Sequence, residues 1–511
     1  MVTYHRPGIY IQENLTPLAD SFNGIPGEAL PCFVAPYNIG PNIPVLVTSW
    51  SLFTQLYGGF TVSGGSYLHF AVYNFFYNGG SACFILRVEN TDAVAGSLAL
   101  QDINTPTPDD VITITSLYPG AYSDNLYAAV SSAGQSGRFN LEIYNGGTSS
   151  ANLVETFVDM SVNPADPRNV ITIVNSPIGG SRYVTLTETL PNSTYVQGTN
   201  DPAIISATPL TGGSDGVDAP DMGMTVPARL DMLQNQILNV NLPSWDDITS
   251  LNAMLTWAEG RADVMMFVDG PAPNFPETSA QVVTNYQTMV SGGSPLQAST
   301  YCAVYAPWVL VKDPSSSVPN ATRWIPPCSF VLADTQQADI QVGPQQSPAG
   351  ILYGKVNCVA LETTFTPTDL NNLNDSQINA LKQVPGYGFN IFGARTLHPG
   401  YPDRYVSVRR VLMKLEHDFQ NVLLFALFQP NAEPLWKQIT AVLTNYLTFE
   451  MQAGTIGGST PADSFAVICD SSNNPPSSAQ SGICNVSVAV ALLSPAEFII
   501  IEISQLTASA S

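Results

Sequence analysis

RYVSVRRVLMKLEHDF (residues 404–419) lies at the centre of the most informative quarter of this chain. Its apolar residues recur every three to four positions, which predicts a helix over 405–427. A second helix is predicted over 433–453, beginning within FQPNAEPLWKQI (428–439). The blocks before and after this helix pair predict short strands over 388–394, 464–469, 484–492 and 497–503. The C-terminal region is therefore expected to be an α+β module.

The region before this module alternates between helix and strand patterns, which predicts a three-layer α/β domain. VMMFVDG (264–270) is a continuous apolar run, typical of a strand covered on both faces. Thr278 and Gln281 form a possible capping box at the start of a helix. Helices are predicted over 228–240, 246–260 and 278–290, a further strand over 301–311, a loose Ser-, Gln- and Pro-rich stretch over 313–349, and a helix-bearing linker over 365–385.

Residues 28–93 read as a compact βαβ-like stretch, with a helix in YLHFAVYNFFY (67–77) between strand patterns. Residues 94–210 then change to short segments in which apolar and polar residues alternate. Short strands at this spacing predict a β-sandwich or barrel. Six such segments are expected: 111–117, 125–132, 138–146, 153–160, 170–176 and 182–190.

The expected fold class is thus a multi-domain α/β chain with a β-rich insertion. The expected divisions are an N-terminal arm with a linker strand (1–25), the N-terminal part of the central α/β domain (26–93), the inserted β-rich outer domain (94–210), the central α/β domain (211–375) and the C-terminal module ending in an arm strand (376–511).

Composition limits the possible partners. Charged residues make up only 11% of the 511 residues, and the net charge is −23. Residues 1–377 carry a balance of −21 and residues 378–511 one of −2. Nucleic-acid binding needs clustered Lys and Arg, so no nucleic acid is expected as a partner. No run of about 18 apolar residues occurs, so no membrane insertion is expected.

The cysteines and histidines indicate no chemical site. The seven cysteines are scattered without a CxxC pair, which favours reduced, buried thiols over zinc or redox work. No HExxH motif accompanies the four histidines, the glycines of Gly212–Gly216, which have the GxSxG spacing, are interpreted as a turn, and His69 is interpreted as a packed or interfacial side chain. Asp215, Asp218 and Asp221 lack the spacing of an EF-hand loop. We therefore expect no catalytic residue, no metal and no cofactor.

Positive charge is concentrated in RYVSVRRVLMKLEHDF (404–419) and at Arg395 shortly before it. On a helix that starts near residue 405, Arg410 and Lys414 share a face. One interpretation is a solvated helix face with Glu416 and Asp418 as local partners. The other is a docking strip for an acidic partner surface, formed by Arg404, Arg409, Arg410 and Lys414.

The two chain ends both predict a short strand beside a proline. Lone terminal strands are marginal unless they pair with another sheet. They pair either within the chain or with a neighbouring chain by β-augmentation. The residues concerned are Gly8, Ile9, Tyr10, Ile11 and Gln12 at the start, and Glu497, Phe498, Ile499, Ile500 and Ile501 at the finish.

Together, these blocks resemble the sheath proteins of contractile bacteriophage tails and related injection machines. GFNIFGARTL (388–397), SFAVICD (464–470) and SPAEFIIIEI (494–503) carry the C-terminal resemblance, with the two helix blocks quoted above. The resemblance covers residues 1–93 and 217–505, while 94–210 matches only as a type. Further matching blocks are PGIYIQE (7–13), SWSLFTQLYGG (49–59), YNFFYNGGSACFILRV (73–88), LTGGSDG (210–216), VDGP (268–271), YAPWV (305–309), WIPPC (324–328) and SPAGILYG (347–354). Gln429, where the family often has Glu, and the divergent strip 328–347 are departures.

The resemblance implies a subtilisin-like but non-catalytic central domain and a C-terminal sheath domain with exchanged terminal strands (8–14 and 496–503). It implies a structural subunit rather than an enzyme. Copies would stack as helical rings around a tail tube and contract to drive the tube through the host envelope.

The implied partners are further copies of the chain, a tail tube protein, and baseplate and tail terminator proteins. The implied location is a virion tail that is assembled in the host cytoplasm. The basic strip would then face the tube. The alternative within this class is the sheath of a phage-derived bacteriocin or of an extracellular contractile injection particle. Rivals from other classes are an enzyme on an α/β scaffold and a capsid or adhesin protein.

Overall fold

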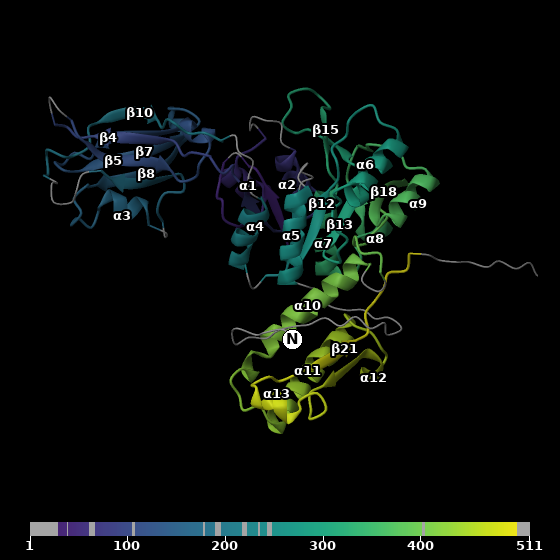
Figure 1. Cartoon of the computed structure of the whole chain (residues 1–511). Coiled ribbons are helices and arrows are strands. Elements are labelled where there is room, and N and C mark those ends of the chain that lie inside the picture. Colours follow the sequence, from purple (N-terminus) through teal and green to yellow (C-terminus); the bar gives the residue numbers. More distant parts are fainter. Residues whose placement is uncertain are drawn as a thin grey trace, which may run out of the picture. The chain divides into compact units, whose positions relative to one another are not determined.

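The computed structural model describes residues 29–37, 39–60, 67–104, 108–176, 179–189, 196–216, 222–233, 236–242, 248–400 and 404–497 (Figure 1). The chain is a mixed α/β protein with several sheets and helices. It divides into two compact units. Unit 1 contains the described residues of Met1–Phe33, Phe70–Cys83 and Gln234–Ser511, and unit 2 contains those of Val34–His69 and Phe84–Leu233.

The main sheet of unit 1 has the strand order β16-β19-β18-β13-β12-β11-β1. Five of these strands run parallel: β1 (Leu30–Ala35), β11 (Leu238–Leu242), β12 (Val264–Asp269), β13 (Cys302–Ala306) and β18 (Ile378–Val384). The strands β19 (Gly388–Ile391) and β16 (Lys355–Val356) extend it antiparallel. Every residue of β12 is buried, as expected for an apolar run covered on both faces.

Helices cover this sheet. α5 (Ile248–Arg261) packs against β12, α7 (Cys328–Gln341) against β11 and β12, and α9 (Pro367–Asp375) against β18 and α6 (Ser279–Ser291). The capping box of Thr278 and Gln281 is present at the start of α6, which confirms that prediction. The remaining elements here are α2 (Leu68–Tyr77), which begins in unit 2, α8 (Gly350–Tyr353), and a small sheet of β14 (Val309–Lys312), β15 (Thr322–Ile325) and β17 (Ala360–Leu361).

The predicted helix over 228–240 is wrong. A helix, α4 (Met222–Leu230), ends with a short 3-10 turn at Leu233, and β11 begins at Leu238. Leu238, Val240 and Leu242 alternate with asparagines, so the same residues also fit a strand. The apolar spacing fits both a helix and a strand, and the strand forms because β11 pairs in parallel with β1 on one side and β12 on the other. The predicted strand 301–311 is likewise two strands, β13 and β14, separated by Pro307.

The loose stretch predicted over 313–349 instead contains α7, whose polar side chains are largely buried. Asp334 accepts a hydrogen bond from Nδ2 of Asn78 at 3.0 Å, and Gln336 accepts one from the backbone N–H of Ser81 at 2.7 Å. The polar composition of this stretch had indicated a loop. Inside the fold, however, these polar side chains accept hydrogen bonds from donors of the segment 78–81.

Asp269, at the end of β12, gives a prediction for the pH dependence of stability. Its carboxyl is completely buried, and this burial raises its pKa to about 7, against the smaller opposing effect of the nearby Cys328 and Asn241. In the unfolded chain the pKa is near 3.9, so between about pH 4 and pH 7 only the folded state keeps the proton. Stability is then lost as the pH rises, by roughly 2–3 kcal/mol between pH 5 and pH 7.

We expect the D269N variant to lose this part of the pH dependence and to be more stable than the unaltered chain at pH 8. Urea unfolding at pH 5 and pH 8 measures both effects. Tryptophan fluorescence is a suitable probe because Trp257, Trp308 and Trp324 all belong to unit 1. If the free energy of unfolding of D269N falls with pH as steeply as that of the unaltered chain, Asp269 is not the cause of the pH dependence.

Unit 2 is built mainly of two antiparallel sheets over one core. Their orders are β10-β6-β7-β8 and β4-β5-β9, and both contribute to a shared cluster that includes Ile112, Ile114, Val130 and Leu141. The strands are β4 (Ser97–Gln101), β5 (Asp110–Ser116), β6 (Leu126–Ser132), β7 (Phe139–Asn145), β8 (Leu153–Met160), β9 (Val184–Glu188) and β10 (Ile205–Pro209), with 3-10 turns at Ala121–Asn125 and Ser150–Asn152.

The predicted strand 170–176 is a helix, α3 (Val170–Val174), that packs against β8 and β9 (Figure 1). β-branched residues favour strands, but here Asn169 caps the helix by accepting a hydrogen bond from the backbone N–H of Thr172. Val170 and Val174, four residues apart, enter the shared core. Tertiary packing therefore overrides the local preference.

The rest of unit 2 contains the end of β1, β2 (Val45–Val47), α1 (Trp50–Tyr57) and β3 (Cys83–Arg87), which starts at the unit boundary. Here the ring of His69 lies in edge contact with Tyr37 and Phe53 and beside the carbonyl of Tyr57. Burial lowers the pKa of His69. The interpretation of His69 as a packed side chain is confirmed.

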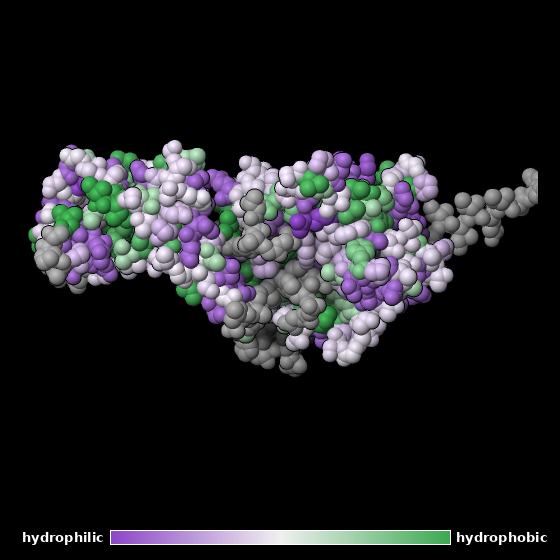
Figure 2. Space-filling model, turned by 90° about the horizontal axis from the view of Figure 1, so that it is seen from above, coloured by the Kyte–Doolittle hydropathy of each residue, from purple (hydrophilic) through white to green (hydrophobic). Residues whose placement is uncertain are grey.

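The surface carries exposed apolar side chains among polar ones. Figure 2 shows hydrophobic residues in several separate groups on the face that it presents. In unit 2, Leu153, Val154 and Val158 of β8 are exposed. In a chain so poor in charge, part of the exposed surface is thus apolar, which is common on folded proteins.

Candidate functional site

The C-terminal part of unit 1 is built on the two predicted helices, α10 (Val406–Val422) and α11 (Glu433–Ala453). Leu435, Ile439, Leu443 and Leu447 recur every four residues on α11 and are buried, as an amphipathic helix requires. A left-handed Gly454 ends the helix. The short elements that follow are α12 (Pro461–Ser464), β20 (Phe465–Ile468), α13 (Pro476–Gln480) and β21 (Ser487–Val490), with a 3-10 turn at Leu424–Ala426 between the long helices.

β20 and β21 form a two-stranded antiparallel sheet that packs on α11 (Figure 1). Phe465 lies opposite Val490, and Ile468 opposite Ser487. Within the described part of the chain, each strand is paired along only one edge. Two-stranded sheets are marginal, and an unpaired edge is a template for a further strand. This sheet is therefore a candidate acceptor for strands from elsewhere, and we call it the acceptor sheet.

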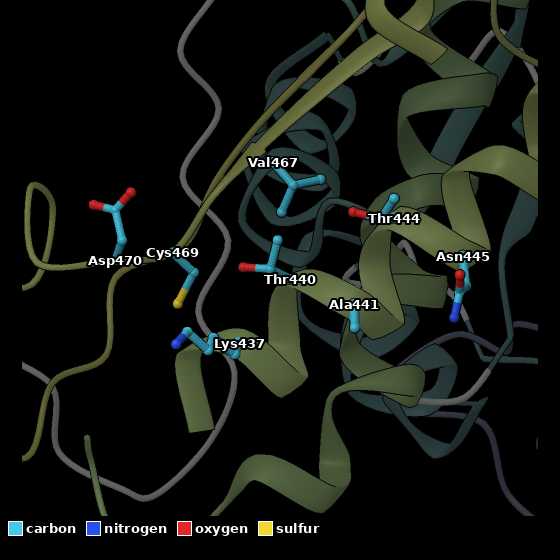
Figure 3. A pocket seen from close by; sticks show the side chains of 8 residues that line it. All are labelled: Lys437, Thr440, Ala441, Thr444, Asn445, Val467, Cys469 and Asp470. Carbon is cyan, nitrogen blue, oxygen red and sulfur yellow. The ribbon is translucent and has the colours of Figure 1, made fainter. Parts of the chain in front are cut away.

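A groove of about 510 Å³ lies between α11 and the end of β20 (Figure 3). One wall is a single face of α11, and the other comes from the strand and the residues after it. Its lining is mostly short side chains: Lys437, Thr440, Ala441, Thr444, Asn445, Val467, Cys469 and Asp470. It flanks the acceptor sheet along its helical side.

The basic residues of α10 do not form an exposed strip. Arg409 and Arg410 are 0% and 2% exposed. The guanidinium of Arg409 lies over the ring of Tyr301 and donates to Glu416 at 3.0 Å. Arg410 forms a buried ion pair with Asp339 of α7. The charges are therefore used to attach α10 to the remainder of unit 1.

Lys414 is also enclosed. Its Nζ lies 2.7 Å from carboxylate oxygens of both Asp418 and Glu450, and 3.1 Å from the hydroxyl of Tyr446. These contacts join α10 to α11. Burial raises the pKa of Asp418, but hydrogen bonds from His417, Lys414 and Tyr446, together with the charge of Lys414, hold it at about 2.

For Arg409, Arg410 and Lys414, the structure corrects both interpretations of the basic segment. Glu416 and Asp418 are partners, as one interpretation expected, but the face is buried rather than solvated. Arg409, Arg410 and Lys414 are not displayed for docking, because carboxylates from α7, α10 and α11 already face them. Arg404 is half-buried and donates to the carbonyl of Pro399 at 2.7 Å, and its contact with a tube stays a prediction.

Arg395 anchors the segment that leads to the C-terminal end. Its guanidinium is bidentate on the Glu497 carboxylate, with Nε 3.0 Å from Oε1, and also donates to the carbonyl of Asn374. Asn379 fixes the Arg395 backbone with hydrogen bonds to both its N–H and its carbonyl. Of the ten residues named above for the two arms, Glu497 is the one that the structure describes. The others, Gly8 to Gln12 and Phe498 to Ile501, lie outside the described residues.

We expect the E497Q variant to loosen this anchor. A charge-assisted pair contributes about 1.5–3 kcal/mol, and a glutamine keeps part of it, so local opening should increase roughly tenfold. Hydrogen exchange of a peptide that covers residues 491–497 measures this. The E433Q variant is the control, because the Lys437–Glu433 pair is exposed and its loss should leave exchange unchanged. Equal exchange in E497Q and the unaltered chain would contradict the anchor.

Other candidate sites find no support among the residues that the structure describes. No cluster of three metal-ligating side chains occurs there, and Asp215 accepts from the backbone N–H of Ala121. Asp218 and Asp221 lie outside the description. No described helix is long and apolar enough to cross a membrane.

No family model and no curated protein matches the chain. Solved structures do match along its whole length. A chain of the PVC sheath complex, from an extracellular contractile injection system in the contracted state, is 20% identical, with 99% of both chains covered and a TM-score of 0.54. A chain of the anti-feeding prophage baseplate is 16% identical, with 99% of this chain and 100% of that chain covered and a TM-score of 0.57. A sheath tail protein from Listeria innocua is 12% identical, with coverages of 88% and 90% and a TM-score of 0.61.

The chain has the fold of a contractile-tail sheath protein.

Sequence reasoning found the helix pair and the strands β20 and β21. It missed Asp339, Glu450 and the pairing of Glu497 with Arg395. Among the ion pairs of Arg395, Arg410 and Lys414, only Lys414–Asp418 has a spacing that the sequence reveals, because residues i and i+4 are neighbours on a helix surface.

Proposed function

We propose that this chain is the subunit of a contractile sheath. Copies polymerise as stacked helical rings around a tube and contract to drive that tube through a cell envelope. The observation that carries the proposal is the likeness over 99% of both chains to a sheath in its contracted state. The role is mechanical, and the expected partners are other copies, a tube protein, and baseplate and terminator proteins at the two ends.

The acceptor sheet supports a specific way of linking copies. Terminal strands of neighbouring chains, residues 8–14 and 496–503, would add to the edges of β20 and β21. Backbone hydrogen bonds of an added strand require no particular side chains. They keep neighbours joined while the bodies rotate between two arrangements. Contraction is downhill when the compact arrangement forms the larger set of contacts, and modest barriers per subunit add up along a cooperative lattice.

Two kinds of particle fit this role. One is a phage tail, in which the sheath belongs to a virion and assembles in the host cytoplasm. The other is an extracellular contractile particle or bacteriocin. The matches include the anti-feeding prophage and PVC assemblies and also a sheath tail protein from Listeria innocua, so they support the sheath role that both kinds of particle share.

Negative-stain electron microscopy of the purified full chain tests the proposal. We expect long, transversely striated tubes whose formation increases with protein concentration. Closed shells would indicate a capsid protein instead. Discrete monomers at every concentration, with or without an added tube protein, would refute a sheath subunit.

A further inference from the structure

Two thiols meet at the end of the acceptor sheet. Sγ of Cys469, which follows β20, lies 3.8 Å from Sγ of Cys484, which precedes β21. Both are free, and together they bracket the loop that contains α13. The cysteines are scattered along the sequence, but the fold brings the sulfurs of this pair together. The 15-residue separation hides it from a search for CxxC.

The backbone on the Cys484 side is held in place by side chains of two other segments. Asn474 donates from Nδ2 to the carbonyl of Asn485 at 2.8 Å and accepts from the N–H of Asn485. On the other side, Asn431 donates to the carbonyl of Ile483 at 2.9 Å. Asn474 also contacts the sulfur of Cys469. The approach of the two sulfurs is thus built into the loop, and no rearrangement of the strands is needed to keep them together.

The site is accessible on one side. Cys484 is half-buried, while Cys469 is 5% exposed and points its sulfur into the groove of Figure 3. The two thiols lie within hydrogen-bonding reach of each other, and either sulfur can be the donor. Cys484 is the more exposed of the two, so its sulfur is the one that an oxidant in solution reaches first.

We propose that Cys469 and Cys484 are a redox pair that closes to an intramolecular disulfide when the folded chain meets a disulfide oxidant such as glutathione disulfide. The Cys484 thiolate attacks one sulfur of glutathione disulfide and releases one glutathione thiolate. The sulfur of Cys469 then attacks Sγ of Cys484 and releases the second. Two cysteine thiols are oxidised, one glutathione disulfide is reduced, and the two cysteine protons end on the two glutathione thiols.

The disulfide fixes the ends of β20 and β21 relative to each other and closes the loop between them. If the chain assembles as proposed above, this stiffens the acceptor sheet after a particle leaves a reducing compartment. That consequence rests on the proposed function, whereas the formation of the bond does not.

The test counts thiols in the full chain. The protein is incubated in glutathione buffers of increasing disulfide content, quenched in acid, unfolded, and labelled with N-ethylmaleimide before its intact mass is measured. The reduced chain has seven cysteines and takes seven labels. The oxidised chain should take two fewer, and peptide mapping should recover Cys469 linked to Cys484.

The C484S variant should take the same number of labels in both buffers, while C358S, which removes another half-buried thiol, should still lose two on oxidation. Three results would overturn the proposal: full labelling at all glutathione disulfide concentrations, glutathione retained on Cys484, or a disulfide between other cysteines. Mapping of the unaltered chain decides the matter even if a variant fails to fold. None of these outcomes bears on whether tubes form.

Discussion

Replacing Arg410 by methionine is expected to lower the free energy of unfolding of unit 1 by about 3–5 kcal/mol. The side chain is 2% exposed, and its partner Asp339 is also almost completely buried. Methionine fills much of the same volume but leaves the carboxylate of Asp339 without its counter-charge. A buried, unpaired charge is among the few causes of so large an effect from one substitution.

The double variant R410M/D339L separates this cause from a loss of packing. Buried ion pairs contribute little net stability, so replacing both partners by apolar residues should restore most of the loss. The control is K437M, because Lys437 belongs to an exposed pair whose removal should change nothing measurable. Urea unfolding followed by tryptophan fluorescence gives all three values. A double variant as unstable as R410M would mean that shape, and not charge, holds α10 to α7.

The loss of unfolding free energy caused by R410M should also depend on pH. Burial raises the pKa of Asp339 to about 6 even with Arg410 beside it, and without the guanidinium that pKa rises further. Below this pKa the carboxyl is neutral and its burial is less unfavourable. The difference in stability between R410M and the unaltered chain should therefore be largest at pH 8 and smaller at pH 5. A difference independent of pH would exclude the carboxylate as its source.

Deleting residues 1–14 is expected to leave a folded chain that forms no tubes. The cores described above are built from residues within 29–497, so the deletion should not disturb them. Under the proposed function, however, it removes a strand that the acceptor sheet of a neighbour needs. An edge of that sheet then stays open, and each subunit loses one of its links to the lattice.

Sedimentation and negative-stain microscopy, beside circular dichroism of the soluble chain, measure the effect of this deletion. A truncation after Glu497 removes the opposite arm and should have the same outcome. The E497Q variant keeps both arms and should reduce tube yield less than either truncation. Tubes of normal length from the chain that lacks residues 1–14 would contradict strand exchange, while a sheath function would survive.

Local sequence patterns were sufficient for features with short-range causes. The capping box at Thr278, the buried run of β12 and the spacing of Leu435, Ile439 and Leu443 on α11 all depend on residues within a few turns or one strand. The β-branched run at 170–174 and the apolar spacing over 228–240 failed for the opposite reason. Each fits two periods, and the choice was made by packing partners that are distant in sequence.

What the sequence by itself determined is where the long helices and buried strands lie, and that α10 carries a cluster of positive charge. Only the tertiary structure decided where that charge points. A cationic helix face is solvated or buried according to which carboxylates reach it, and these come from far away: Asp339 is 71 residues from Arg410, and Glu450 is 36 residues from Lys414. The same holds for Cys469 and Cys484, because a loop, and not a motif, brings their sulfurs together.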